Sequence, residues 1–322
     1  MTENEQKNKC FVIFGPTASG KTAFSAQLAT LLGTDKSVIL NADSMQLYKD
    51  LPILTACPEE VEYQGIEHHL FEIYDPDTHN SVALWWDQCV TYMKTAFEQN
   101  KTVIIIGGTG LYLKSILKGL PQTPQRDEHL ALKAKILFDE MGASAFYQIL
   151  KQEDPLIEGA IQESDTQRLI RAYEVFHATS KSLLEWQKEP YQQVPFSCEF
   201  VYHQIIPDRE WLYDRCNRRF DYMIEQGAIE EIDNFIHKYG HDDFDLCRKV
   251  IGFDELRDYQ AGKLSLEEAR NQAAQRTRRY AKRQLTWART QMSEKILERE
   301  VKQWYEWNEE TIKTKAVKTI GS

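Results

Sequence analysis

The eight residues GPTASGKT, from Gly15 to Thr22, constrain what this chain can fold into more than any other stretch. They match the pattern G-x-x-x-x-G-K-[ST], with an apolar run at residues 10–14 before them and a helical pattern at residues 22–32 after them. A strand, a glycine-bearing turn and a helix in this order aim backbone N–H groups and the positive helix end at one point. We therefore predict a phosphate-binding loop made of Gly15, Pro16, Thr17, Ala18, Ser19, Gly20, Lys21 and Thr22.

Two side chains at the end of this loop carry its chemistry. Lys21 would place a positive charge beside a di- or triphosphate, and the Thr22 hydroxyl would be a ligand for Mg²⁺ held between protein and phosphates. The alternative is a surface turn that matches by chance, and the flanking strand and helix argue against it. The identity of the phosphate compound is left open at this point.

Alternating strands and helices predict the architecture around the loop. Short apolar runs at residues 38–40, 68–73 and 102–106 alternate with helical patterns at residues 82–99 and 111–117. Buried strands separated by helices indicate an α/β fold of the P-loop NTPase-like type, a parallel sheet with helices on both faces. Ligands of such sheets bind at the carboxyl ends of strands. Asp43 and Thr109 follow two of these strands, so we expect them near the loop.

Residues 122–199 depart from this alternation and have helical periodicity alone. We predict an all-helical insertion there, a returning strand at residues 201–206, and helices from residue 210 to about residue 307. The chain thus divides into a core of residues 1–121 and 200–309, the insertion at 122–199, and a polar tail at 310–322. The polar start, residues 1–9, is expected to fray and has no apolar segment typical of a signal peptide.

Composition limits the classes of protein that remain. The 322 residues carry a formal net charge of −10 and are 42% hydrophobic, which is ordinary globular material and no general binder of polyanions. Six cysteines without a C-x-x-C pair suit reduced thiols rather than a disulfide framework or a zinc site. No apolar run approaches the roughly 18 residues of a membrane span. We expect a soluble cytoplasmic protein.

Basic residues are nevertheless concentrated in three places. Residues 270–290 hold seven Lys or Arg and no acidic residue, interleaved with aromatic side chains, a pattern typical of nucleic-acid contact. Arg215 and Arg219 lie one helical turn apart and could meet a pyrophosphate from the side opposite the loop. A third group is at residues 167–171. Each cluster alone could be a solvated helix face. The candidates for RNA contact in the first cluster are Arg279, Lys282 and Arg283.

Several polar residues allow two interpretations. Asp43 is either a general base or Mg²⁺-associated carboxylate, or the cap of a turn. Thr109, in the segment GGTG, either hydrogen-bonds a phosphate oxygen or belongs to a flexible turn. His68 and His69 would face opposite sides of a strand, which favours core or interface positions over a shared metal ion. The acidic segment at residues 241–245 is interpreted as a solvated turn.

The ordered set of motifs resembles the tRNA dimethylallyltransferases of bacterial type. Beside the phosphate loop, the resemblance rests on DSMQLYK at 43–49, GGTGLYLK at 107–114, DTQRLIRA at 165–172 and YAKRQLTW at 280–287. It implies that the loop holds the diphosphate of dimethylallyl diphosphate and that Asp43 takes a proton from N6 of adenosine 37 in tRNA as N6 attacks the prenyl C1. Thr109, Lys21, Arg215 and Mg²⁺ held through Thr22 would stabilise the departing diphosphate.

The resemblance also implies the partner, a tRNA anticodon stem-loop bound by a monomer, with the helical insertion holding the stem-loop. The implied tRNA contacts are Asp43, Ser44, Met45, Gln46, Thr109, Gln167, Arg168, Leu169, Ile170, Arg171, Arg248, Lys249, Val250, Ile251, Gly252 and Phe253. Two segments depart from the family pattern: ILTACP at 53–58 lacks a usual glycine and lysine, and IGFDE at 251–255 lacks a usual tyrosine and a cation. The alternatives are an adenylate isopentenyltransferase acting on free AMP or ADP, a P-loop small-molecule kinase, and an RNA-binding module without activity.

Overall fold

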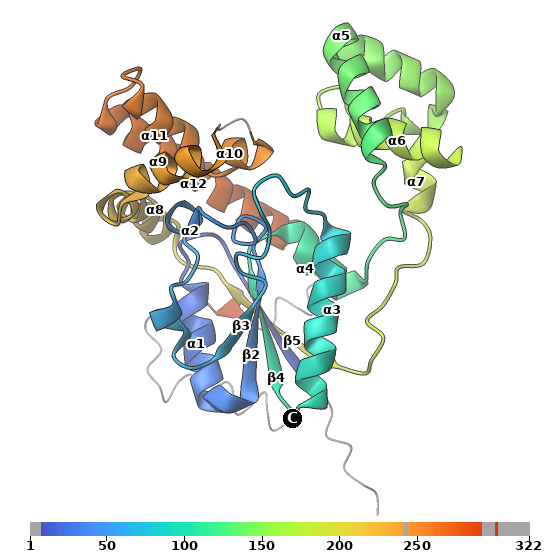
Figure 1. Ribbon diagram of the computed structural model, residues 1–322. Coiled ribbons are helices and arrows are strands. Elements are labelled where there is room, and N and C mark those ends of the chain that lie inside the picture. The colour runs from blue at the N-terminus through green and yellow to red at the C-terminus, as the bar shows by residue number, and fades with distance from the viewer. Residues whose placement is uncertain (1–7, 241–243, 292–299, 302–322) are drawn as a thin grey trace, which may run out of the picture. The chain divides into compact units, whose positions relative to one another are not determined.

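The computed structural model describes residues 8–240, 244–291 and 300–301 (Figure 1). Its contacts divide the chain into two compact units, one formed by Lys118–Gln193 and the other by the residues on either side of that segment. Each unit has its own hydrophobic core. The insertion predicted at residues 122–199 thus corresponds to a unit that begins and ends a few residues earlier.

The larger unit is built on a parallel sheet that, in the described residues, has six strands in the order β3-β2-β4-β1-β5-β6. The strands are β1 (Lys9–Phe14), β2 (Ser37–Ala42), β3 (Glu67–His69), β4 (Thr102–Gly107), β5 (Glu199–Ile205) and β6 (Glu300–Val301). In the central register, Val12 of β1 lies between Ile105 of β4 and Tyr202 of β5. The predicted α/β fold is confirmed, and the strand that follows the insertion does rejoin the sheet.

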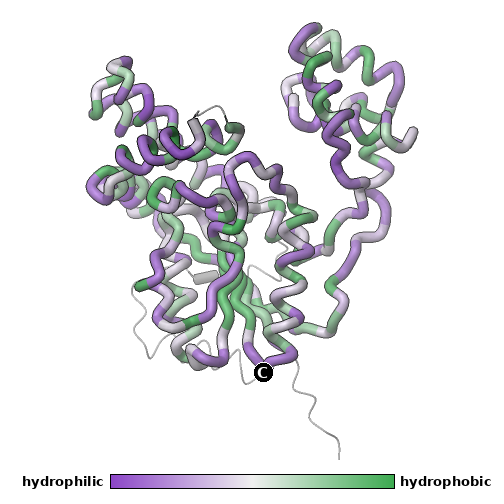
Figure 2. Tube along the Cα trace, viewed as in Figure 1, coloured by the Kyte–Doolittle hydropathy of each residue, from purple (hydrophilic) through white to green (hydrophobic). Residues whose placement is uncertain are grey.

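Helices cover both faces of this sheet. On one face, Phe24 and Leu28 of α1 (Lys21–Leu32) pack against Phe11, Ile13 and other alternate residues of the strands. Figure 1 shows α3 (Val82–Glu98) on the opposite side, where the Trp85 indole donates to the carbonyl of residue 41, 2.8 Å away. Every residue of β2 is buried, as expected of a strand covered on both faces. Figure 2 shows the strands as the most continuous apolar part of the chain.

The third strand is shorter than the sequence predicted. We expected it at residues 68–73, but β3 ends at His69. Leu70 and Glu72 have positive φ angles of 65° and 48°, which an extended strand does not allow. The chain instead turns back, and the backbone N–H groups of Glu72 and Ile73 donate to the carbonyls of residues 46 and 47. The apolar run is therefore a partly buried turn, with Leu70 as its buried residue, and it supports the segment after β2.

The C-terminal part of the larger unit is helical. Its helices are α8 (Arg209–Glu225), α9 (Ala228–Tyr239), α10 (Asp245–Lys249), α11 (Phe253–Gln260) and α12 (Leu266–Gln291). Gly227, Gly240 and Gly252 separate them with positive φ angles of 96°, 75° and 103°. The smaller elements of this unit are α2 (Pro52–Thr55), α4 (Gly110–Lys118), η1 (Thr34–Lys36) and η2 (Glu60–Tyr63).

Helix was predicted up to about residue 307, and this is wrong at Glu300–Val301, where β6 pairs with β5 in parallel. That pairing gives the outer edge of β5 backbone hydrogen-bond partners, which a helix could not supply. The predictions for residues 1–7, 241–243, 292–299 and 302–322, which include the frayed start, most of the acidic segment and the polar tail, lie outside the described residues. The last residue of the acidic segment, Asp245, begins α10 instead of lying in a turn. Lys9, predicted to fray, begins β1.

The Lys118–Gln193 unit contains α5 (Glu128–Glu153), η3 (Pro155–Ile157), α6 (Thr166–Thr179) and α7 (Leu183–Trp186). Phe146 and Leu150 of α5 pack on Leu169 and Tyr173 of α6 in its core. Two backbone hydrogen bonds of 2.9 Å between Leu120 and Gln192 join the segment that leads into this unit to the segment that leads out of it. Within the described ranges, no helix is both long and apolar enough to cross a membrane.

Candidate active site

The loop between β1 and α1 has a backbone shaped for an anion. Ala18 and Gly20 have positive φ angles of 61° and 89°, a conformation that turns neighbouring N–H groups to one side. Gly15 has no room for a side chain, because a Cβ there would lie 2.7 Å from the carbonyl oxygen of Ile205. Helix α1 starts at Lys21, so the N–H groups of its first turn, which have no partner within the helix, face this loop. The glycines are thus required by close packing and by the turn.

Lys21 lies within this loop and is half-buried. Its ammonium donates to the carbonyl of Pro16, 2.8 Å away. Burial lowers the pKa of Lys21 to about 8; Asp43 nearby works against this by raising it, and Arg219 lowers it further. The residues predicted as cation and carboxylate therefore lie close enough to interact electrostatically.

Asp43 follows β2 and closes a tight turn. One carboxylate oxygen accepts the N–H of Met45 at 3.0 Å, and the Asn41 side chain holds the Asp43 N–H and C=O at 2.8 and 3.0 Å. The second Asp43 carboxylate oxygen makes no hydrogen bond to any described residue. The two interpretations of Asp43 are therefore compatible, because the cap uses one oxygen and leaves the other available for chemistry.

Thr109 lies at the end of β4 beside this turn. Its hydroxyl accepts the N–H of Ser44 at 3.0 Å, and its own N–H donates to the carbonyl of Ala42 at 3.2 Å. Gly107 lies so close to the Ala42 carbonyl that a Cβ would overlap it. The turns after β2 and β4 are thus packed together, as predicted for two carboxyl ends of neighbouring strands.

Helix α12 reaches both loops through Gln284, which the sequence analysis did not single out. The Gln284 amide oxygen accepts the N–H of Thr17 at 2.8 Å, and its amide nitrogen donates to the carbonyl of Gly108 at 3.0 Å. Trp287 follows Gln284 by three residues in α12, and its ring lies against Gly110. A Cβ at Gly110 would lie 2.5 Å from the indole. In the sequence, Gln284 stands only within the segment YAKRQLTW, and its partners at Thr17 and Gly108 become visible in the fold.

Two arginines of α8 contact the phosphate loop from another side. The Arg215 Nε donates to the carbonyl of Ala18 at 2.9 Å, and its guanidinium lies 4.8 Å from the Trp211 ring centre. Arg219 donates to the Thr17 hydroxyl at 3.0 Å. Burial lowers the pKa of both guanidinium groups. The pair predicted to meet a pyrophosphate therefore lies against the loop that would hold it.

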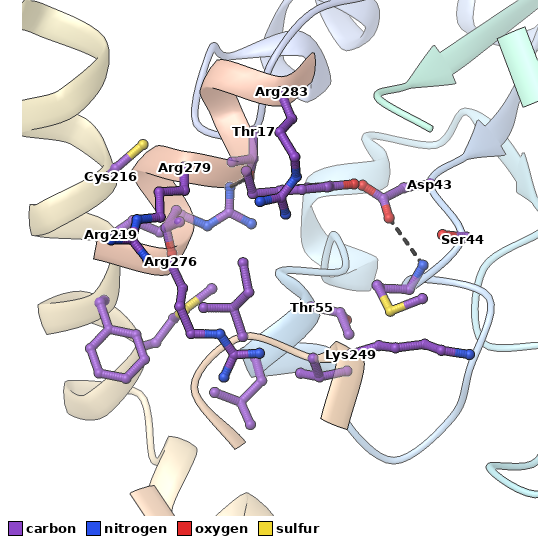
Figure 3. A pocket seen from close by; sticks show the side chains of 18 of the residues that line it. Thr17, Asp43, Ser44, Thr55, Cys216, Arg219, Lys249, Arg276, Arg279 and Arg283 are labelled. Atoms are coloured by element: carbon purple, nitrogen blue, oxygen red, sulfur yellow. Dashed lines mark hydrogen bonds between the residues drawn. The ribbon is translucent and has the colours of Figure 1, made fainter. Parts of the chain in front are cut away.

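A cavity of about 500 Å³ opens beside these groups (Figure 3). Figure 3 places Asp43 on one side of it and Arg219, Arg279 and Arg283 from α8 and α12 on the other. Leu54 of α2 and Phe220 and Met223 of α8 make part of its wall apolar, and six Lys or Arg side chains also line it. The lining residues are Thr17, Asp43, Ser44, Met45, Leu54, Thr55, Cys216, Arg219, Phe220, Met223, Arg248, Lys249, Val250, Ile251, Arg276, Thr277, Arg279, Tyr280 and Arg283.

The segment at residues 53–58 forms part of this wall. Glu231 of α9 holds it in place by accepting the N–H groups of Ile53 and Leu54 at 2.6 and 3.0 Å. Burial raises the pKa of Glu231 to about 7. Gln46, predicted to contact tRNA, donates to the carbonyls of Thr55 and Ala56 at 3.2 and 2.7 Å. Backbone bonds to Glu231 and Gln46 therefore position this segment.

Three residues predicted to touch RNA have their side chains in hydrophobic cores. Val250 and Phe253 belong to the core of the C-terminal helices and Leu169 to that of the Lys118–Gln193 unit, each at most 2% exposed. Burial of an apolar side chain stabilises the fold, so core packing accounts for these three side chains, and RNA contact at these positions stays a prediction. Arg171 bonds to Glu174 and to the carbonyl of Pro124, so it supports the fold of α6.

Most of the other predicted RNA contacts are at least partly exposed, with Gly252 as an exception. In the Lys118–Gln193 unit, Gln167 and Arg168 are exposed, and Ile170 is half-buried. In the larger unit, Lys282 is exposed outside the lining of the cavity, whereas Gly252 is buried at the start of α11. A Cβ at Gly252 would meet the Phe220 ring at 2.7 Å, so this glycine serves the packing of α11 on α8.

The histidine pair has partners that explain it without a metal. His68 stacks on Tyr63 with ring centres 4.0 Å apart, and His69 stacks on Tyr92 at 4.1 Å and bonds to Glu67 at 2.6 Å. The two rings thus contact different neighbours, as strand alternation predicted. Throughout the described ranges, no three His, Cys, Asp or Glu side chains form a group able to hold a metal ion.

The fold and this site define a P-loop α/β protein with a cavity rich in Arg and Lys side chains beside the phosphate loop. A sequence model of the IPP transferase family matches residues 46–291, and the chain belongs to this family. It is 38% identical over 316 residues to a tRNA dimethylallyltransferase of Anoxybacillus flavithermus, covering 97% of this chain and 94% of that protein. It is 37% identical over 296 residues to the tRNA dimethylallyltransferase of Rickettsia rickettsii, covering 91% and 80%.

Solved structures agree with these relatives. A tRNA isopentenylpyrophosphate transferase from Bacillus halodurans is similar with a TM-score of 0.65 and 30% identity, covering 98% of this chain and 96% of the other. A eukaryotic dimethylallyltransferase acting on tRNA is similar with a TM-score of 0.80 and 27% identity, covering 98% and 80%. The resemblance found in the sequence is therefore confirmed at the level of the family.

Proposed function

We propose that this chain transfers the dimethylallyl group of dimethylallyl diphosphate to N6 of adenosine 37 in tRNA and releases diphosphate. Membership in the IPP transferase family and similarity to tRNA dimethylallyltransferases support prenyl transfer to tRNA. The observation that carries the proposal is the position of Asp43, a carboxylate with one available oxygen, between the phosphate loop and a cationic cavity.

The phosphate loop would hold the leaving group. The Lys21 ammonium and the guanidinium groups of Arg215 and Arg219 bond to the loop itself and supply positive charge beside it, and α1 adds the free N–H groups of its first turn. As the bond from C1 to the diphosphate oxygen breaks, negative charge grows on the diphosphate. Donors fixed in advance by the fold stabilise that charge without having to reorganise. Thr109, held beside Ser44, would add a hydroxyl at the same edge.

Asp43 would act as the general base. The N6 amine forms a bond to C1 of the prenyl group, the C1–O bond breaks with its electron pair going to diphosphate, and the N6 proton moves to the available Asp43 oxygen. An exocyclic amine is a weak nucleophile, so removal of its proton at the transition state helps the reaction. The cavity wall near Phe220 would accept the adenine once it has left its stack, as other base-modifying enzymes require.

Mg²⁺ fits the donors at the end of the loop. The Thr22 hydroxyl makes no hydrogen bond to any described residue and remains available as an oxygen ligand, and Mg²⁺ binds through few protein oxygens and several phosphate oxygens. When bound, the ion would neutralise charge on the diphosphate. The proposed cofactor is therefore Mg²⁺, with Thr22 as its protein ligand.

The macromolecular partner we propose is the anticodon stem-loop of tRNA, bound by a monomer in the cytoplasm. Arg248, Arg279 and Arg283 make the cavity entrance cationic, which favours a phosphate backbone. The exposed side chains of Gln167 and Arg168 offer contacts in the Lys118–Gln193 unit. A free nucleotide would not need a cationic surface of this extent, which is why we favour tRNA over AMP or ADP as acceptor.

One assay tests the proposal. The protein is incubated with Mg²⁺ and radiolabelled dimethylallyl diphosphate, with tRNA, AMP, ADP or no acceptor in parallel. We expect label in tRNA alone. Label in AMP or ADP would instead support an adenylate isopentenyltransferase, and ATP hydrolysis or phosphoryl transfer without label in any acceptor would support a kinase.

A further inference from the structure

We propose that Gln284 is a positioning residue for the reaction, which ties the phosphate loop to the loop that carries Thr109. This inference rests on the proposed function for its catalytic meaning. Its structural basis is the pair of hydrogen bonds from one buried amide to Thr17 and Gly108, residues that are separated from Gln284 by 267 and 176 positions in the chain.

The amide has few alternatives for its hydrogen bonds. Gln284 is 8% exposed, and α12 fixes its backbone between the buried residues Ala281 and Ala288. The amide oxygen accepts from a backbone N–H, and the amide nitrogen donates to a backbone carbonyl. Both hydrogen bonds of the side chain are therefore made to main-chain groups. A buried amide that is half-satisfied costs more than a hydrogen bond gains, so the two bonds stabilise one arrangement.

The two groups held by Gln284 belong to the two halves of the site. Thr17 lies in the phosphate loop and is also held by Arg219. Gly108 directly precedes Thr109, which holds the turn of Asp43 through Ser44. Gln284 therefore connects the group that would hold the diphosphate with the group that would take the proton, through a single side chain.

The glycine at position 108 is explained by the same contact. A Cβ there would overlap the amide nitrogen of Gln284, and it would lie 3.1 Å from the carbonyl oxygen of Gly15. The close approach of the two loops thus leaves space for the amide and for no side chain at residue 108. Gln284 fills the gap between them as a spacer of fixed length.

Replacing Gln284 would change the distance between the two loops and not the charge of the site. Methionine at residue 284 has similar length and would fill the gap, but it neither accepts from Thr17 nor donates to Gly108. Phosphate-loop N–H groups would then lose their fixed direction, and the distance between diphosphate and base would vary. A displacement of about 1 Å at a reacting centre can cost on the order of 100-fold in rate.

The experiment measures diphosphate binding and turnover for the full chain and for Gln284→Met, with Gln275→Met as control. Gln275 is an exposed glutamine of the same helix, so its substitution tests the chemical change alone. Calorimetry with inorganic diphosphate and Mg²⁺ needs no prenyl transfer, so it tests Gln284 even if the proposed activity is wrong. We expect Gln284→Met to weaken diphosphate binding about tenfold or more, from two lost hydrogen bonds, and Gln275→Met to leave it unchanged.

Three further substitutions test the same contact if Gln284→Met folds poorly. Gly108→Ala should weaken diphosphate binding by displacing the amide, and the same change should cost much less in a Gln284→Ala background, because the displaced group is then absent. Gln284→Glu should bind diphosphate poorly at neutral pH and recover relative to the parent chain in mild acid, since only a protonated carboxyl can both accept from Thr17 and donate to Gly108. Additive effects of the two alanine substitutions, or a Gln284→Met protein with parental diphosphate affinity and turnover, would overturn the proposal.

Discussion

Replacing Asp43 with asparagine separates its two roles. Asparagine keeps an oxygen that can accept the N–H of Met45, the 3.0 Å bond that closes the turn, so the fold of the segment should survive. It removes the oxygen that would take the N6 proton. General-base catalysis contributes about 100- to 10,000-fold, so kcat should fall by about that factor, equivalent to roughly 3–5 kcal/mol in the activation free energy.

The assay is single-turnover prenyl transfer to tRNA, with diphosphate and tRNA binding measured in parallel. We expect both affinities of Asp43→Asn to stay within about threefold of the parent chain, because the residue contributes to the reaction step and not to anchoring either ligand. Asp75→Asn is a matched control, since Asp75 pairs with Lys49 at the surface, where a single ion pair contributes little. If Asp43→Asn retains most of the parental kcat, Asp43 is not the base and the mechanism is wrong.

Three further predictions follow from groups around the site. Burial lowers the pKa of Lys21 to about 8, so its positive charge is lost as the pH rises through that value. Diphosphate affinity, measured by calorimetric titration, should fall over the same pH range. Lys21→Arg should remove this pH dependence. Glu231→Gln leaves one of the two N–H groups at residues 53–54 without its acceptor, so urea unfolding should show a loss of about 1–3 kcal/mol, and an unchanged midpoint would contradict the assigned role. Gly107→Ala forces a Cβ into the Ala42 carbonyl, so it should lower the melting temperature and the rate together, whereas a fully stable and active variant would show that the two strand ends can separate.

Much of the fold followed from local patterns. The apolar run before Gly15 and the helical period after it predicted β1, the loop and α1, because strand and helix periodicities are properties of neighbouring residues. The placement of Asp43 and Thr109 at adjacent strand ends followed from the rule for parallel sheets. In the structure the Thr109 hydroxyl accepts the N–H of Ser44, the residue after Asp43, so the two strand ends lie together.

Other features depended on contacts between distant parts of the chain. Gln284 was not recognised, because its partners at Thr17 and Gly108 are far away in sequence and no local period marks a bridging amide. Val250 and Phe253 looked like part of an RNA-binding segment, yet they pack in a core formed by several helices. The early end of β3 came from the left-handed backbone at Leu70, which its apolar side chain does not signal.

The chemical identity and position of the product test prenyl transfer to tRNA more directly than any variant does. After reaction with dimethylallyl diphosphate and Mg²⁺, the tRNA is digested and its nucleosides and fragments are analysed by mass spectrometry. We expect one added dimethylallyl group, on N6 of adenosine 37, with release of one diphosphate per group transferred. Unmodified tRNA together with a prenylated free nucleotide, or no prenylated product in any reaction, would contradict the proposed prenyl transfer to tRNA.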